Sequence, residues 1–354
     1  MTIAYSGDSI TFPDNSVQNT AATGFGFKNR IINGAMVIDQ RNAGARVAVT
    51  GFQFAVDRFN SVRANGATQT ITSQRSTVAP AGFVNSLLYS VTTGGAVAAG
   101  DICYIGQSVE GFNTADFGWG TANAVPITLS FKARSSLTGT FGVILRGSTG
   151  AIAATYTISA ANTFEDKTIT FAAQTSGTWA TDNSAGIQVF WDMGVGTTYS
   201  LAAGSYTAGS FYGVAGVTKL AATTGATFYI TGVQLEKGST ATSFDYRPYG
   251  TELALCQRYY QQGFTWFGKF NSAVSFYAYG TYQVEMRAAP TATYIAGGSV
   301  SEIGVADRSV TAIPSYAGNN KGGYYQATVS GATSGNAGAN AAGAPTIAGF
   351  SAEL

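Results

Sequence analysis

The sequence contains no histidine, and this absence excludes several kinds of catalytic and metal site. Ser-His-Asp and Cys-His relays, imidazole acid–base catalysis and zinc sites with histidine ligands all need that side chain. Cysteine is almost as scarce: Cys103 and Cys256 are too few for a four-cysteine zinc site or a disulfide framework. Both stand alone among apolar residues, so we expect buried free thiols. The sequence has no Gly-Lys-Ser/Thr phosphate loop and no Asp-rich calcium loop, and we expect no cofactor and no metal.

Charged residues are also scarce. Charged residues make up 10% of the chain, whereas about 25% is usual for a soluble domain. The 19 Lys and Arg and the 18 Asp and Glu residues leave a net charge of +1. We expect no nucleic-acid partner, since binding to nucleic acid depends mainly on neutralised phosphates. Copies of a chain with so little surface charge repel each other only weakly, so the composition predicts an oligomer of identical chains.

Long apolar runs are also missing. The most apolar stretches, such as residues 94–100, are short and consist of Gly, Ala and Val. They are far below the roughly 20 residues that a membrane helix needs, and we expect no membrane insertion. The start of the chain lacks the basic-then-apolar order of a signal peptide, so we expect no secretion by that route.

Aromatic residues are abundant, with 22 Phe and 19 Tyr, and 45% of the chain is hydrophobic, which indicates a folded protein. Apolar and polar residues alternate in many short stretches, as in a strand with one buried face. Clear examples are residues 127–131, 141–145, 168–171 and 187–191. Turn residues separate these stretches. Many short strands at this spacing predict an all-β fold, a jelly-roll β-sandwich.

One segment departs from the strand pattern. Apolar residues recur at helical spacing over residues 251–262, Thr251 is a suitable N-cap, and Pro248 and Gly263 mark the limits. This short helix divides the chain. We expect an N-terminal attachment segment at 1–28, the sandwich at 29–249, the helix within 250–263 and a smaller C-terminal β domain at 264–354. The Gly/Ala-rich stretch 330–345 is expected to be a loop or disordered.

Several stretches together resemble a module of bacteriophage tail fibre and tail tip proteins. Residues 29–36, 39–41 and 57–59 resemble the opening of this module, and residues 230–238, 241–247 and 252–260 resemble its closing pattern. The resemblance covers roughly residues 29–290. It implies a sandwich similar to carbohydrate-binding modules, carried on a trimeric virion fibre. It transfers no set of ligand residues.

The resemblance implies a homotrimer that is made in the host cytoplasm and belongs to the virion tail. Its N-terminus would attach to phage tail or baseplate proteins, and it would adhere to a host surface glycan without catalysis. Three alternatives stay open. A polysaccharide depolymerase would need two carboxyl groups across the scissile bond, for which Asp101, Glu110 and Asp116 are candidates. The others are a purely structural tip or decoration protein and a cellular lectin.

Aromatic rings are the candidate glycan-binding residues. Sugars stack on exposed rings that polar side chains flank. Trp119 and Trp179 lie in turn-like, glycine-rich surroundings that favour exposure, whereas Trp191 alternates within a strand and belongs to the core. In the C-terminal strands, Trp266, Tyr277 and Tyr279 are the candidates, and Tyr277 and Tyr279 share one face of their strand.

The charged residues of the resembling stretches suit a structural role. We expect ion pairs that hold the leading segment to the edge of the sandwich. The expected members are Asp57, Arg58, Glu236, Asp245, Arg247 and the helical Arg258.

Overall fold

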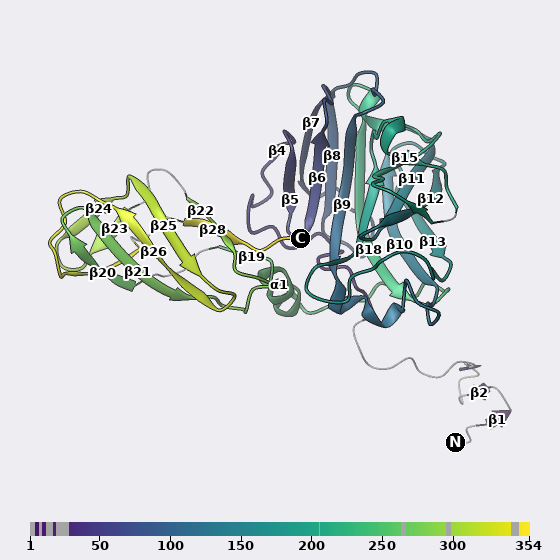
Figure 1. Ribbon diagram of the computed structural model, residues 1–354. Coiled ribbons are helices and arrows are strands. Elements are labelled where there is room, and N and C mark those ends of the chain that lie inside the picture. Colours follow the sequence, from purple (N-terminus) through teal and green to yellow (C-terminus); the bar gives the residue numbers. More distant parts are fainter. Residues whose placement is uncertain are drawn as a thin grey trace.

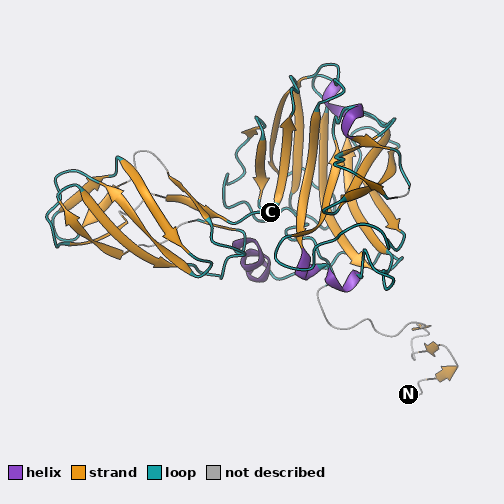
Figure 2. Ribbon diagram, in the orientation of Figure 1, coloured by secondary structure: helices purple, strands orange, loops and turns teal. Residues whose placement is uncertain are grey.

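The computed structural model describes residues 4–6, 9–11, 17–18, 28–204, 206–262, 267–294, 299–340 and 347–354 (Figure 1). Within these ranges the protein is nearly all β, with one α-helix between two β domains (Figure 2). Four short 3₁₀ helices add to this: η1 (Gly111–Asn113), η2 (Ala115–Phe117), η3 (Thr197–Tyr199) and η4 (Leu220–Ala222). Near the N-terminus a small antiparallel sheet has the order β1 (Ala4–Ser6), β2 (Ser9–Thr11), β3 (Val17–Gln18).

The first domain is a sandwich of two antiparallel sheets, as the alternating stretches predict. The six-stranded sheet has the order β13 (Glu165–Phe171), β10 (Ile127–Ser135), β18 (Thr227–Lys237), β8 (Ser86–Thr93), β7 (Thr70–Ser76), β4 (Val47–Ala48). The seven-stranded sheet has the order β16 (Thr207–Ala208), β12 (Gly150–Ile158), β11 (Gly139–Arg146), β14 (Ala185–Asp192), β9 (Ile102–Glu110), β6 (Phe59–Ala64), β5 (Phe52–Val56). Neighbouring strands are often far apart in sequence, which confirms the jelly-roll arrangement.

The core of this domain lies between the two sheets. In β10 the alternate residues Ile127, Leu129 and Phe131 are fully or almost fully buried, which is the expected pattern for a strand with one inner face. The ring of Phe131 meets that of Trp191 edge-on, with centroids 5.6 Å apart. Trp191 is completely buried, so its predicted core position is confirmed. The two cysteines are free and buried, also as expected.

The outer face of the seven-stranded sheet is partly covered by the chain itself. The connection between β14 and β18 includes a parallel pair, β15 (Ser200–Leu201) and β17 (Gly213–Val214), and brings Tyr212 onto this face. Its ring stacks on Tyr104 with centroids 5.7 Å apart and planes at 9°. Strand β9 is therefore buried along its whole length. This part of the face is not an open binding surface.

The helix α1 (Tyr249–Gln257) is shorter than the predicted 251–262. It begins after Pro248, which occupies the N-cap position that we assigned to Thr251. Proline is well tolerated at a helix start, where an N–H group has no helical partner. The helix ends early because the following residues form strand β19 (Tyr260–Gln261), which pairs with β28 (Ile347–Ser351). Long-range pairing here overrides the local helical spacing.

The second domain contains a three-stranded and a seven-stranded sheet. The first has the order β19, β28, β22 (Thr291–Tyr294). The second has the order β24 (Ala306–Ser309), β23 (Ser299–Glu302), β27 (Ala337–Asn340), β20 (Phe267–Ser272), β21 (Ser275–Thr281), β26 (Gly322–Thr328), β25 (Ala312–Gly318). A separate core forms around Phe270, Phe276 and Tyr325. Strand β27 lies in the stretch 330–345, so the expectation of a loop there is wrong for residues 337–340.

No helix of the described residues combines the length and the apolar character needed to cross a bilayer.

Candidate functional site

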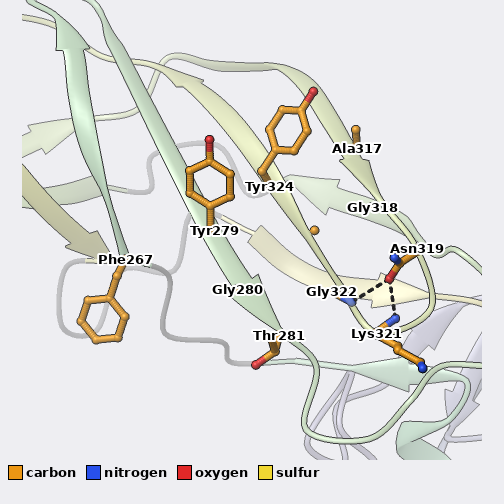
Figure 3. A pocket seen from close by; sticks show the side chains of 11 residues that line it. Phe267, Tyr279, Gly280, Thr281, Ala317, Gly318, Asn319, Lys321, Gly322 and Tyr324 are labelled. Atoms are coloured by element: carbon orange, nitrogen blue, oxygen red, sulfur yellow. Dashed lines mark hydrogen bonds between the residues drawn. The ribbon is translucent and has the colours of Figure 1, made fainter.

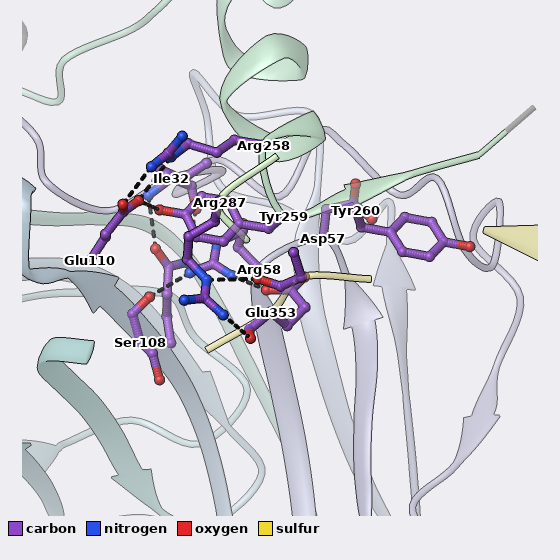
Figure 4. A network of polar contacts seen from close by, with 12 residues as sticks. Ile32, Asp57, Arg58, Ser108, Glu110, Arg258, Tyr259, Tyr260, Arg287 and Glu353 are labelled. Carbon is purple, nitrogen blue, oxygen red and sulfur yellow. Dashed lines mark hydrogen bonds and ion pairs between the residues drawn. The ribbon is translucent and has the colours of Figure 1, made fainter. Parts of the chain in front are cut away.

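The two domains meet at a network of buried charges (Figure 4). Arg58 donates to the Ser108 carbonyl at 2.5 Å, forms an ion pair with Glu353, and lies 3.5 Å above the ring centroid of Tyr259. Its side chain is 2% exposed, and burial lowers its pKa to about 10. Arg41 pairs with the same Glu353 carboxylate at 3.0 Å. Residues far apart in sequence are thus held at one junction.

Glu110 and Arg258 form the second part of this junction. The Arg258 guanidinium donates two hydrogen bonds to the Glu110 carboxylate, at 2.9 and 2.5 Å, and the Tyr259 hydroxyl donates a third at 2.7 Å. Burial alone raises the pKa of Glu110, but these hydrogen bonds outweigh it and leave the pKa below its ordinary value. Arg258 thus forms an ion pair, as expected, but its partner Glu110 is on β9, so it holds the end of α1 to the sandwich and not the leading segment.

The leading segment is held as the charged pattern predicts. The Asp245 carboxylate accepts the Lys28 backbone N–H at 2.8 Å, and Arg247 donates to the Ile31 carbonyl at 3.0 Å. Arg247 also forms an ion pair with Glu252 at 3.2 Å. These contacts hold the chain against the sandwich where the first domain begins.

Of two further predicted residues, Asp57 forms the expected ion pair and Glu236 does not. Asp57 pairs with Arg41 at 3.5 Å and also accepts hydrogen bonds from Gln40. Glu236 pairs with no cation in the described part of the chain: its carboxylate accepts from the Thr242 hydroxyl and backbone N–H instead. The expected ion pair of Glu236 is therefore wrong, and its carboxylate is held by hydrogen bonds from neutral donors.

The three carboxylates of the depolymerase hypothesis are not brought together. Asp101 and Glu110 flank strand β9 at opposite ends, about 30 Å apart at the usual rise per residue. Asp116 forms ion pairs with Arg30 at 3.0 Å and Lys237 at 3.5 Å. Asp101 accepts the Ala98 backbone N–H at 2.9 Å, and Glu110 is held by Arg258, so each of the three groups has its own structural partners. The described residues also contain no group of three or more acidic or cysteine side chains that could hold a metal ion.

Trp119 and Trp179 are core residues, which corrects the expectation that their loops expose them. They are 5% and 7% exposed, and their rings meet edge-on with centroids 4.8 Å apart. Each indole N–H donates to a backbone carbonyl, of Val125 at 2.8 Å and of Ser176 at 3.0 Å. The glycine-rich loops fold back over the end of the sandwich and bury these rings, so neither offers a free face to a ligand.

The three candidate glycan-binding residues of the second domain differ in their exposure to solvent and in whether the structure describes them. Trp266 lies outside the described residues. Tyr277 and Tyr279 lie on the same face of β21, as predicted, because Phe276 and Ala278 point into the core between them. Tyr277 is half-buried, whereas Tyr279 is 63% exposed.

Tyr279 belongs to a row of exposed rings that crosses three neighbouring strands (Figure 3). It is in register with Phe267 on β20 and with Tyr324 on β26. Phe267 is 64% exposed and Tyr324 is 39% exposed. The ring centroids of Tyr279 and Tyr324 are 6.0 Å apart. Strand pairing thus assembles an aromatic row, which we define as Phe267, Tyr279 and Tyr324.

The aromatic row borders an open groove of about 970 Å³. The opposite border is the turn between β25 and β26, where Asn319 accepts the backbone N–H groups of Lys321 at 2.8 Å and Gly322 at 3.2 Å. Such a bond shapes an Asx turn and fixes this border. Thr281 adds a hydroxyl to the groove. The groove combines exposed ring faces with polar groups, and it is our candidate functional site.

Phe267 and Tyr324 were not among the candidate residues predicted from the sequence. The alternation in residues 322–328, with Tyr325 and Ala327 buried, places Tyr324 on the open face and is readable in the sequence. The pairing that aligns Phe267 with Tyr279 is not readable, because it depends on the register of β20 on β21.

Comparisons with known proteins give only remote likenesses. No protein-family model matches the chain, and no curated protein matches it in sequence. Among solved structures, the enzymatically active domain of bacteriophage CBA120 tailspike protein 4 is similar over 59% of this chain and 21% of that one, with 13% identity and a TM-score of 0.30. The chain thus spans about a fifth of that tailspike domain.

Two bacterial structures are similar over their whole length. A putative sugar-binding protein from Bacteroides thetaiotaomicron matches over 59% of this chain and 100% of that one, with 12% identity and a TM-score of 0.31. The family 11 carbohydrate-binding module of Clostridium thermocellum, in complex with a mixed-linked tetrasaccharide, matches over 56% of this chain and 100% of that one, with 11% identity and a TM-score of 0.29.

Proposed function

We propose that the chain is a bacteriophage tail fibre or tail tip protein that adheres to a glycan on the host cell surface and performs no catalysis. The observation that carries glycan binding is the aromatic row beside the groove of the second domain. The virion role is supported by the stretches at both ends of the sandwich that resemble the phage module.

The groove has the chemistry that glycan recognition needs. Sugar rings present apolar faces that pack on aromatic rings, while their hydroxyls hydrogen-bond to nearby polar groups. The aromatic row supplies the ring faces, and Thr281 and Asn319 supply polar groups in the same groove. The row extends over two strand spacings, about 10 Å, a length that suits a short oligosaccharide. Contacts of this kind are individually weak, and several linked copies of the chain would add avidity.

The proposal includes a homotrimer that attaches to phage tail or baseplate proteins through its N-terminus and is made in the host cytoplasm. Self-association is supported by the scarcity of charge and by an exposed apolar patch beside α1. The patch consists of Val84, Tyr246 and Tyr249, which are 68%, 58% and 64% exposed. Together with Phe83 and Phe244 these residues line a hollow of about 230 Å³.

Substitution of the aromatic row tests the glycan site. Tyr279→Ala and Phe267→Ala each remove a ring face, so each should weaken binding by roughly 3- to 10-fold. The measurement is binding to an array of immobilised bacterial surface oligosaccharides, with circular dichroism of each variant. Phe112→Ala is the matched control, because Phe112 is a 63% exposed ring on the first domain. Equal binding by all variants would contradict this site, and no binding by the unaltered protein would contradict glycan adhesion and leave a purely structural virion role.

A further inference from the structure

One lysine lies on the sheet face that carries the aromatic row, and a second lies in the turn between β25 and β26. Lys269 lies two residues after Phe267 on β20, about 7 Å along the strand and on the same face. It is in register with Tyr277 on the neighbouring strand. Lys321 lines the groove at its other border. Both lysines are exposed, and neither ammonium forms an ion pair with a described residue.

The described residues that line this groove include no carboxylate. On the turn side, the Glu285 carboxylate accepts a hydrogen bond from Asn320. On the other side, Asp307 is in register with Ser301, and this row continues through Ala339 to Phe267. Three strand spacings, about 14 Å, therefore separate Asp307 from the nearest ring of the aromatic row. Among the described residues that line the groove, Lys321 is the one charged side chain, and Lys269 lies on the other side of the aromatic row, level with Tyr277.

We propose that the groove selects an acidic oligosaccharide, one that carries carboxylate groups of the uronic-acid kind, with Lys269 and Lys321 facing its anionic groups. This inference rests on the proposed function, which needs only that some glycan binds to the aromatic row. The rings would hold the sugar faces, and the two ammonium groups would favour the charged sugars over neutral ones. Exposed charges act through a screened field, so the preference weakens as salt increases.

The test uses the full chain and pairs of ligands that differ only in charge. Uronate-containing bacterial oligosaccharides are immobilised beside their carboxyl-reduced, neutral counterparts. We expect the reduced forms to bind several-fold more weakly. Lys269→Gln and Lys321→Gln should each lower affinity for the acidic forms by roughly two- to fivefold and leave the neutral forms unchanged. Lys132→Gln, an equal change of charge on the first domain, is the control and should have no effect.

The outcomes separate this inference from the proposed function. Equal binding of acidic and reduced forms, or lysine variants that keep the full preference, would overturn the acidic ligand. If Tyr279→Ala still weakened binding in that case, the glycan site itself would stand. Loss of the preference by the control variant as well would show a general effect of net charge, and this too would overturn the assignment to Lys269 and Lys321. Absence of any Tyr279-dependent binding would remove both proposals.

Discussion

A buried guanidinium such as that of Arg58 is costly unless its charge and its N–H groups find partners. The structure provides an ion pair with Glu353, a backbone carbonyl and a ring face, all in one place. Arg41 has the same kinds of partner: it pairs with Glu353, and its guanidinium lies 3.6 Å from the ring centroid of Tyr260. Much of the scarce charge of the chain is thus placed where segments must be joined.

Glu110 gives a prediction with a pH dependence. Because its pKa is lowered in the folded protein, the carboxylate stabilises the fold fully above its ordinary pKa of 4.5, and this contribution is lost as pH falls through the folded pKa. Glu110→Gln should therefore lower the free energy of unfolding by ~2 kcal/mol at pH 7. The difference from the unaltered protein should shrink in acid.

Urea denaturation at a series of pH values measures this difference. Asp307→Asn serves as the comparison, because this carboxylate is exposed and far from the junction. A destabilisation by Glu110→Gln that stays constant down to strongly acidic pH would show that the ionised carboxylate is not what holds the junction.

Among the elements, β20 depends on a glycine. A Cβ atom on Gly268 would collide with the Tyr277 carbonyl oxygen on the paired strand β21. Gly268→Ala should therefore separate the two strands, destabilise the second domain by about 1–3 kcal/mol and weaken glycan binding, because Phe267 and Tyr279 lose their register. Calorimetry and the oligosaccharide array measure the two effects.

Gly250 in α1 provides the matched control for this substitution. A Cβ atom added to Gly250 would meet no other atom within contact distance, and the residue lies in a helix. Gly250→Ala should therefore keep or slightly raise stability and leave binding unchanged. Full binding and stability in Gly268→Ala would refute the close approach of β20 and β21.

Alternation along each strand was enough to predict the sandwich, the burial of Trp191 and the shared face of Tyr277 and Tyr279. These are local consequences of a two-residue period. The exposure of Trp119 and the end of α1 were predicted wrongly, because tertiary contacts decide both. The Trp119 indole is buried, although its glycine-rich surroundings favoured exposure, and pairing with β28 places Tyr260 and Gln261, predicted to be helical, in a strand. The aromatic row likewise needs a register that no local pattern encodes.

At the scale of the whole molecule, the apolar patch beside α1 gives a prediction about assembly. If the patch is covered in a homotrimer, Tyr246→Ser together with Tyr249→Ser should shift the mass in solution from trimer toward monomer, since exposed polar hydroxymethyl groups replace buried rings. Sedimentation velocity measures the mass. Phe112→Ser is the control on a separate surface. A monomeric unaltered protein would contradict the trimer outright.

The pairing of β19 with β28 has a consequence for synthesis. Tyr260 is in register with Ser351, and the chain between them forms the rest of the second domain. At the usual pace of about 5–20 residues per second, a ribosome needs roughly 5–20 s to add these intervening residues. During that interval β19 lacks its strand partner, and Arg41 and Arg58 lack the Glu353 carboxylate. The ion pairs of Glu353 with Arg41 and Arg58 therefore form only after the second domain has been made, whereas Arg258 can pair with Glu110 earlier.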